Sequence, residues 1–119
     1  MLRVMCKSKL HNAVVTAVKL RYGGSIKIDE YLMKKADIIP NEMVLVVNLR
    51  NGKRFETYAV PARKHSGEIV LLGGTALLGR KGDKLIIISS CFMEDRKARS
   101  YKSKHIYIKG RNKIKAPIA

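Results

Sequence analysis

The Asn51-Gly52 pair most narrows the folds that this chain can adopt, because it is the strongest short hairpin signal in the sequence. Both residue types tolerate the positive φ angles that tight hairpin turns demand. Residues 43–49 before the pair are mostly apolar, and apolar and polar residues alternate in 54–60 after it. Two such runs around Asn-Gly are typical of adjacent antiparallel strands. The middle of the chain therefore predicts a β-hairpin.

Short strand-like runs separated by turn residues continue on both sides of this hairpin. Gly82-Asp83 predicts a turn into 84–92, the most continuous apolar strand. Asp29 is expected to cap a short helix that runs through Ala36. Further strands are expected at 2–6, 13–20, 26–28, 68–72 and 106–108, with a short helical stretch at 94–99. Many short strands and few helical residues favour a mainly β protein, a small barrel formed by one domain over 1–119.

The charge balance limits the choice of partners. The chain has 25 Lys and Arg against nine Asp and Glu, a formal net charge of +16 and a pI near 10.2. Such a balance favours anionic partners, nucleic acid among them. The excess is greatest in a basic C-terminal extension, 96–119, with nine Lys or Arg and no acidic residue. No Trp and two Phe leave few rings for stacking on bases. Nucleic-acid binding is therefore the weaker expectation.

Cysteine usage and hydropathy indicate the compartment. Two cysteines, Cys6 and Cys91, are too few for a disulfide framework or a metal site. No apolar run reaches the ~18 residues that a membrane span needs. The opening 1–7 is too short and too interrupted for a secretory signal. These features predict a cytoplasmic, reduced protein without a membrane partner or a bound metal.

The Gly23-Gly24-Ser25 stretch has two interpretations. On general turn statistics the two glycines form a turn between strands. Alternatively, the protein itself breaks the Gly24–Ser25 bond, since a serine hydroxyl can attack the preceding carbonyl where the backbone is bent and strained. A glycine before the serine removes the side chain that would obstruct this attack. The two interpretations are compatible if the turn strains the bond that Ser25 attacks.

Several short motifs then occur in one order along the chain: Lys9-Leu10-His11, Tyr22-Gly23-Gly24-Ser25, Asn51-Gly52-Lys53-Arg54-Phe55, Thr57-Tyr58, and Gly82-Asp83 before an Ile-rich strand. At this spacing the set resembles the aspartate 1-decarboxylase family, pyruvoyl-dependent enzymes that make β-alanine for pantothenate synthesis. The resemblance covers about residues 1–95. It implies a six-stranded double-psi β-barrel with short helices, which agrees with the independent strand prediction, and a homotetramer.

The resemblance also implies a chemistry for the Gly24–Ser25 bond. The Ser25 hydroxyl would attack the Gly24 carbonyl to give an ester, and β-elimination and hydrolysis would leave a pyruvoyl group and ammonia. The products would be a β chain, 1–24, and an α chain, 25–119, that stay in one barrel. The pyruvoyl ketone would form a Schiff base with the amine of L-aspartate and accept the electrons that decarboxylation leaves behind.

Other residues match functional positions of that family. Tyr58 matches the position of the family's proton donor. A phenol suits that role, since it is protonated at neutral pH and can give up a proton. Arg54 matches a clamp on the side-chain carboxylate of the substrate, with Lys9 near that carboxylate. Thr57 matches a residue that binds substrate and hydrogen-bonds the Gly24 carbonyl during cleavage. Contacts between backbone and substrate fall on Gly73, Gly74 and Thr75.

Each of these residues also has a structural interpretation. Tyr58 could simply pack its ring in a barrel, and Arg54 could be solvated beside the hairpin turn. Lys9 taken alone is a surface lysine. His11 is more simply a structural hydrogen-bonding residue, although the resemblance places it near the cleavage site.

Leu72 is the clearest departure from the family pattern, which has asparagine followed by Gly-Ala-Ala-Ala. Leucine cannot make the side-chain hydrogen bonds of asparagine, which puts in question unaided self-cleavage and leaves room for a maturation helper protein. Thr75 adds a hydroxyl to the same segment. Two alternatives stay open: an uncleaved, inactive family member, and a small basic β-barrel that contacts nucleic acid through 96–115. No sequence feature excludes a related acidic substrate such as glutamate.

Overall fold

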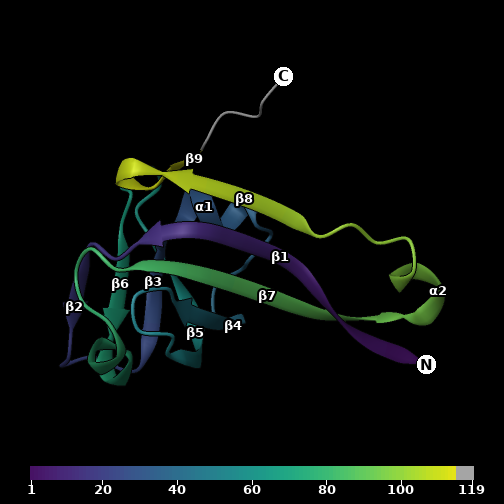
Figure 1. The fold of residues 1–119 in the computed structure, drawn as a ribbon, viewed down its shortest axis with the longest axis horizontal. Coiled ribbons are helices and arrows are strands. Elements are labelled where there is room, and N and C mark those ends of the chain that lie inside the picture. Colours follow the sequence, from purple (N-terminus) through teal and green to yellow (C-terminus); the bar gives the residue numbers. More distant parts are fainter. Residues whose placement is uncertain (115–119) are drawn as a thin grey trace.

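The computed structural model describes residues 1–114, so that residues 115–119 of the expected basic extension lie outside the described part. These residues form one sheet in the order β2-β6-β3-β5-β4-β7-β1-β8-β9 (Figure 1). The strands are β1 (Leu2–Val14), β2 (Ala17–Lys19), β3 (Ser25–Asp29), β4 (Met43–Asn48), β5 (Arg54–Ala62), β6 (Ile69–Leu72), β7 (Lys84–Glu94), β8 (Lys104–Lys109) and β9 (Lys113–Ile114). The helices are α1 (Glu30–Lys35), α2 (Asp95–Ala98) and the 3₁₀ turns η1 (Gly73–Leu78) and η2 (Gly110–Asn112).

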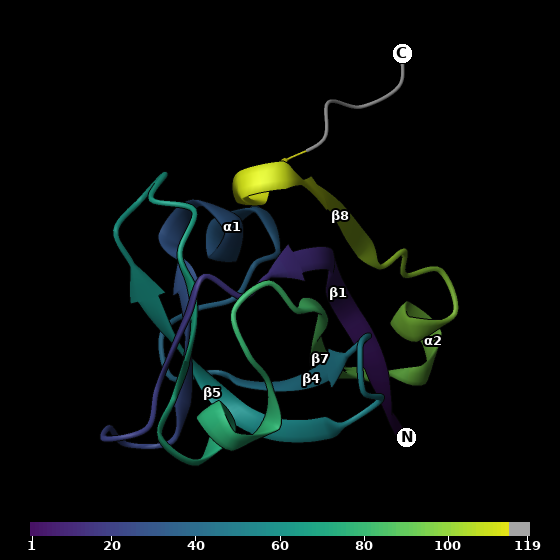
Figure 2. The same cartoon turned by 60° about the vertical axis from the view of Figure 1, so that its left-hand side comes forward.

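The expected mainly β fold is confirmed, and the details of the sheet differ from the expectation. The described residues contain nine strands where six were expected, and the sheet is not closed, since its outermost strands β2 and β9 are not paired with each other. Figure 2 shows the sheet curling from β1 through β7 and β4 to β5. This curl is consistent with a β-barrel, and it encloses a core of aliphatic side chains that includes Leu10, Ile26, Val46, Leu71 and Ile87.

The predicted hairpin is present. β4 and β5 pair antiparallel from Met43↔Tyr58 to Val47↔Arg54. Gly52 has a φ of 73°, and its amide donates to the carbonyl of Asn48 at 2.8 Å. Asn51 does not share the positive φ, because the connection is longer than the two-residue turn that the pair most often forms.

The N-terminal strand is longer than the sequence pattern indicated. β1 is continuous over the expected strand 2–6 and the residues after it, with register shifts at Cys6/Ser8 and Leu10/Ala13. The segment 7–12 was missed because its polar residues interrupt the apolar alternation. Pairing to β7 on one side and, in parallel, to β8 on the other satisfies the backbone there (Figure 1). The expected strand 13–20 was wrong in its continuity, since β1 ends at Val14 and β2 begins at Ala17.

The helix predicted after Asp29 is confirmed as α1. The Asp29 carboxylate caps it by accepting the Tyr31 amide at 2.8 Å, and it also accepts the amides of His65 and Gly67 at 2.9 Å each. Asp29 is buried, so these bonds compensate the cost of removing its charge from water. The cap therefore attaches the end of β3 to the segment that leads into β6. None of the described helices is long and apolar enough to cross a membrane.

Candidate functional site

Strand register brings together three residues that are far apart in the sequence. β3 lies between β5 and β6, with Ile26 opposite Ala59 on one side and Ser25 opposite Leu72 on the other. Ile26 and Ala59 are fully buried and face the core. Because side chains alternate along a strand, Ser25, Tyr58 and Leu72 share the other face of three neighbouring strands. The sheet thus places the expected proton donor beside the expected cleavage residue.

The loop before Ser25, residues 20–24, is the cleavage loop, and it packs tightly on Gly73, the first residue of η1. Gly73 has a φ of +67°, and a methyl group there would lie 2.4 Å from the Tyr22 carbonyl oxygen and 2.7 Å from the Gly24 nitrogen. At Gly24 an added methyl group would meet nothing within 4 Å. Close packing therefore requires glycine at position 73, whereas the resting structure has room for a side chain at position 24.

The Tyr58 hydroxyl lies close to the same loop. A methyl group placed on Gly23 would be 3.9 Å from it. The loop thus lies close to Tyr58 of β5 and in contact with Gly73, and η1 contacts β2, β3 and β6 (Figure 1). Tyr58 is half-buried.

Ser25 itself is nearly closed off from water, at 3% exposure. Its hydroxyl donates to the Gly23 carbonyl at 3.2 Å. Its own carbonyl accepts a hydrogen bond from the Thr75 hydroxyl at 3.1 Å. The Thr75 hydroxyl also lies 2.9 Å from the Leu72 carbonyl oxygen, and Thr75 is 8% exposed. Thr75 was expected as part of a substrate contact, and its hydroxyl was noted as an addition to the Leu72 segment. Its bond to Ser25 depends on how η1 folds and had no signal in the sequence.

Thr57 lies on the opposite face of β5 from Tyr58. It is 7% exposed and shares the core-facing side with Ala59. Within residues 1–114 no hydrogen bond joins its hydroxyl to Gly24, so its expected part in cleavage stays a prediction.

The two cations expected to bind the substrate lie apart from the Ser25 loop. Arg54 is exposed and precedes Tyr58 by four residues along β5, a Cα distance of about 13 Å. Lys9 is opposite Ile88 of β7, which is opposite Leu45 of β4, so that β7 and β4 separate β1 from β5. Among the described residues no hydrogen bond or ion pair links either cation to the loop.

His11 belongs to a different cluster. Its Nε2 lies 2.9 Å from Nδ1 of His105 on β8, and its ring stacks on Tyr107 with the ring centroids 4.6 Å apart. Partial burial lowers the pKa of His11, and the neighbouring His105 and Lys9 lower it further. These contacts support the structural interpretation of His11.

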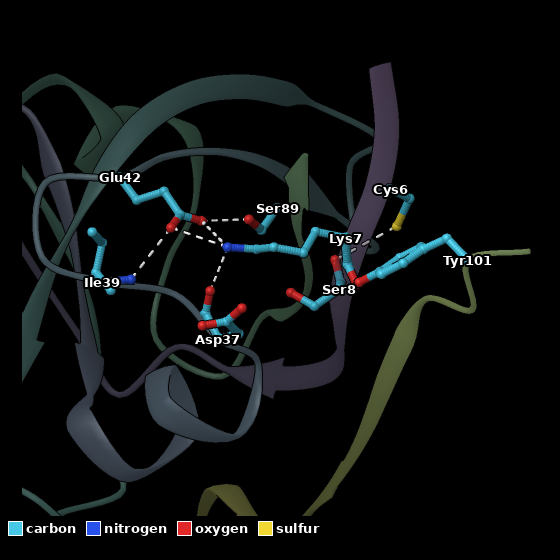
Figure 3. A network of polar contacts seen from close by, with 8 residues as sticks. All are labelled: Cys6, Lys7, Ser8, Asp37, Ile39, Glu42, Ser89 and Tyr101. Carbon is cyan, nitrogen blue, oxygen red and sulfur yellow. Dashed lines mark hydrogen bonds and ion pairs between the residues drawn. The ribbon is translucent and has the colours of Figure 1, made fainter. Parts of the chain in front are cut away.

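A second polar network joins β1 to the loop after α1 (Figure 3). The Lys7 ammonium lies 3.1 Å from both carboxylate oxygens of Glu42, and it also donates to the Asp37 carbonyl. Glu42 in turn accepts from Ser89 of β7. Burial raises the pKa of Tyr101, whose hydroxyl donates to the Lys7 carbonyl at 2.8 Å. This network contains none of the expected site residues, and we assign it a structural role.

Comparison with known proteins identifies the family of the chain. The family model described as aspartate decarboxylase matches residues 1–115. The aspartate 1-decarboxylase of Moorella thermoacetica is 52% identical over 98% of this chain and 91% of the relative. The enzyme of the same name from Thermoanaerobacter pseudethanolicus is 50% identical over 95% of this chain and 97% of the relative. The chain belongs to the aspartate decarboxylase family.

Proposed function

We propose that this chain cuts itself between Gly24 and Ser25 and then decarboxylates L-aspartate to β-alanine and CO₂, a step toward pantothenate. Family membership over nearly the whole chain supports the activity. The observation that carries the assignment to this site is the buried Ser25, which follows two glycines in a tightly packed loop beside the Tyr58 hydroxyl. In this proposal Ser25 is the nucleophile, the Gly24–Ser25 bond is the bond that breaks, and Tyr58 is the acid.

We infer that the cofactor is a pyruvoyl group formed from Ser25 and that the barrel is of the double-psi type. The surroundings fit such a group, because Ser25 is enclosed and its carbonyl already has a hydrogen-bond donor in Thr75. The group would supply the electron sink that decarboxylation of an amino acid requires. Gly73, Gly74 and Thr75 would form the wall on the η1 side.

The remaining roles are those that the resemblance to the family implies. Tyr58 would give a proton to the substrate carbon that loses CO₂. Arg54 and Lys9 would hold the side-chain carboxylate of aspartate. A cation on the departing carboxylate would stabilise the ground state and slow the reaction, so the clamp belongs at the other end of the substrate.

Assembly into a homotetramer would bring these parts together. Since Lys9 and Arg54 lie away from Ser25 in one chain, a neighbouring copy is the simplest source of the clamp. The surface also carries large apolar side chains that a second copy would cover, among them Leu2, Val4, Ile39, Met43, Leu77 and Phe92.

Intact mass of the purified, denatured protein tests the proposal. We expect two fragments, 1–24 and 25–119, the latter lacking the elements of ammonia relative to an N-terminal serine. The matched control is Ser25→Ala, which we expect to stay whole and inactive while keeping its fold. A single 119-residue species that persists after heating, with no β-alanine formed from aspartate, would falsify the proposal.

A further inference from the structure

The hydroxyl of Thr75 has one proton and two acceptors. It lies 2.9 Å from the Leu72 carbonyl oxygen and 3.1 Å from the Ser25 carbonyl oxygen. A single O–H cannot satisfy both fully, so in the resting chain it is shared between them. Thr75 and Ser25 are both almost excluded from water, at 8% and 3% exposure. A change of charge on either oxygen would therefore draw the proton toward that oxygen with little competition from solvent.

The proposed self-cleavage changes the charge on one of these two oxygens. After the acyl shift, the Gly24 carboxyl is esterified to the Ser25 oxygen and the former Ser25 nitrogen is a free amine. β-Elimination then removes the proton on Cα of Ser25, which passes to solvent. The bond between Cβ and the ester oxygen breaks, releasing the Gly24 carboxylate and leaving a Cα=Cβ double bond. While the Cα proton leaves, negative charge spreads onto the adjacent Ser25 carbonyl oxygen, but none develops on the Leu72 oxygen.

We propose that Thr75 is a catalytic residue of self-cleavage, whose hydroxyl stabilises the negative charge that forms on the Ser25 carbonyl oxygen during β-elimination. This rests on the proposed self-cleavage. The donor is already in place before the reaction, so the active geometry requires little reorganisation. Because its bond to Ser25 is the longer of the two at rest and strengthens as charge develops, Thr75 favours the transition state over the ground state. The Ser25 carbonyl remains in the chain after cleavage, so the donor also stays beside the finished group.

The position of Thr75 depends on the packing around Gly73. The positive φ of Gly73 starts η1 directly after β6, and Thr75 follows two residues later. The antiparallel pair Ser25↔Leu72 keeps the two acceptor residues on adjacent strands. A donor that reaches both carbonyls is therefore a product of strand register and the η1 turn together.

The test compares Thr75→Val with Thr75→Ser. Valine has nearly the shape of threonine without the hydroxyl, whereas serine keeps the hydroxyl. Freshly made, uncleaved chains are incubated and sampled over time, and each sample is divided and treated with or without hydroxylamine before denaturing mass measurement. Hydroxylamine splits the ester and gives a 25–119 fragment with an N-terminal serine. This fragment is heavier by one ammonia than the pyruvoyl fragment that elimination followed by hydrolysis gives.

We expect the valine variant to eliminate about 100- to 1000-fold more slowly, the range found on removing one oxyanion donor. Its hydroxylamine-sensitive ester should persist, since the acyl shift does not need Thr75. The serine variant should process within a few-fold of the original chain. A general disturbance of the site would slow ester formation as well. The fraction of ester therefore separates such a disturbance from the specific loss of the Thr75 hydroxyl. If valine at this position prevents folding, shown by the loss of cooperative unfolding, Thr75→Ala carries the same expectation.

Three outcomes overturn the role of Thr75 while leaving the proposed function intact. In the first, the valine and alanine variants process at the rate of the original chain. In the second, the serine variant is as slow as the valine variant. In the third, ester and product decline together in the valine variant. A different result addresses the proposed function: if the original chain yields neither ester nor fragments, self-cleavage itself is wrong, and the role of Thr75 is wrong with it.

Discussion

The cleavage loop and the expected carboxylate clamp differ in how completely one chain builds them. Around Ser25, strands β5, β3 and β6 place Tyr58 and Leu72 on one face of the sheet, and η1 places the Thr75 hydroxyl against the Ser25 carbonyl. Arg54 and Lys9, by contrast, are held on strands whose register keeps them away from that loop. Self-cleavage requires atoms of the same chain at fixed distances, whereas substrate binding can draw on a second copy. The contrast predicts that substitutions around Ser25 affect self-cleavage, whereas substitutions of Arg54 or Lys9 affect only the decarboxylation of aspartate.

Gly73→Ala should have the largest effect, because it disrupts the packing of the cleavage loop. Alanine would be strained at the positive φ and would overlap the Tyr22 oxygen and the Gly24 backbone. We expect a loss of at least about 2 kcal/mol in unfolding free energy and little or no cleavage. Urea unfolding and intact mass measure the two effects.

The matched control is Gly24→Ala, where an added methyl group has open space. It should keep nearly the original stability, and any loss of cleavage there would reflect the reaction path and not the resting fold. Equal destabilisation by both substitutions would contradict the packing that we describe.

Arg54→Ala tests the other region. Losing a charge-assisted contact with the substrate carboxylate costs about 1.5–3 kcal/mol, so we expect kcat/KM for aspartate to fall about 10- to 100-fold. Cleavage between Gly24 and Ser25 should proceed at its original rate. Steady-state kinetics and intact mass of the same sample provide both readouts.

Mixing Arg54→Ala with Ser25→Ala chains extends this test to the oligomer. If the clamp comes from a neighbouring copy, co-folded mixtures should regain activity that neither variant has alone. A mixture no more active than Arg54→Ala by itself would place the whole site within one chain.

Leu72→Asn should have a smaller effect on the first region. Leu72 lies opposite Ser25 and on the same sheet face, so an amide there would be a new hydrogen-bond donor beside the loop. We expect cleavage to become several-fold faster, measured as the half-time of fragment formation. Leu72→Ala controls for the removal of bulk. If asparagine does not accelerate cleavage, the inference that Leu72 slows self-cleavage is wrong.

The smallest effect should come from Asp83, which lies outside both regions. Hydrogen bonds from Arg50 at 2.6 Å and from Asn48 at 2.8 Å lower the pKa of Asp83 to about 2, against a cost from burial. Because the folded pKa is depressed, this stabilisation is present above about pH 4 and is lost as the pH falls toward 2. Thermal unfolding should show Asp83→Asn less stable by about 1–2 kcal/mol at pH 7, with the difference shrinking below pH 4.

Cleavage of the Asp83→Asn chain at pH 7 should be unchanged, because Asp83 bonds to Asn48, Arg50 and the Arg80 amide and to none of the residues that bond to Ser25. A constant stability difference from pH 7 to pH 2 would contradict the assignment of the lowered pKa to the folded state.

Local patterns predicted the elements that depend on neighbouring residues. The Asn51-Gly52 hairpin and the Asp29 cap of α1 were correct, since turns and caps are decided within a few residues. β1 was predicted too short, because its polar middle becomes a strand only through pairing with β7 and β8. β9 was not predicted for the same reason, because it is held by pairing with β8.

The sequence by itself determined the mainly β fold, the glycine-serine loop and, through its motifs, the family to which the chain belongs. Only the tertiary structure decided that Gly73 and not Gly24 is the sterically required glycine, that the Thr75 hydroxyl meets the Ser25 carbonyl, and that Lys9 and Arg54 lie away from both. The physical reason is that such contacts depend on strand order and register. A shift of one residue in register would turn Ser25 to the other face of the sheet and remove the site.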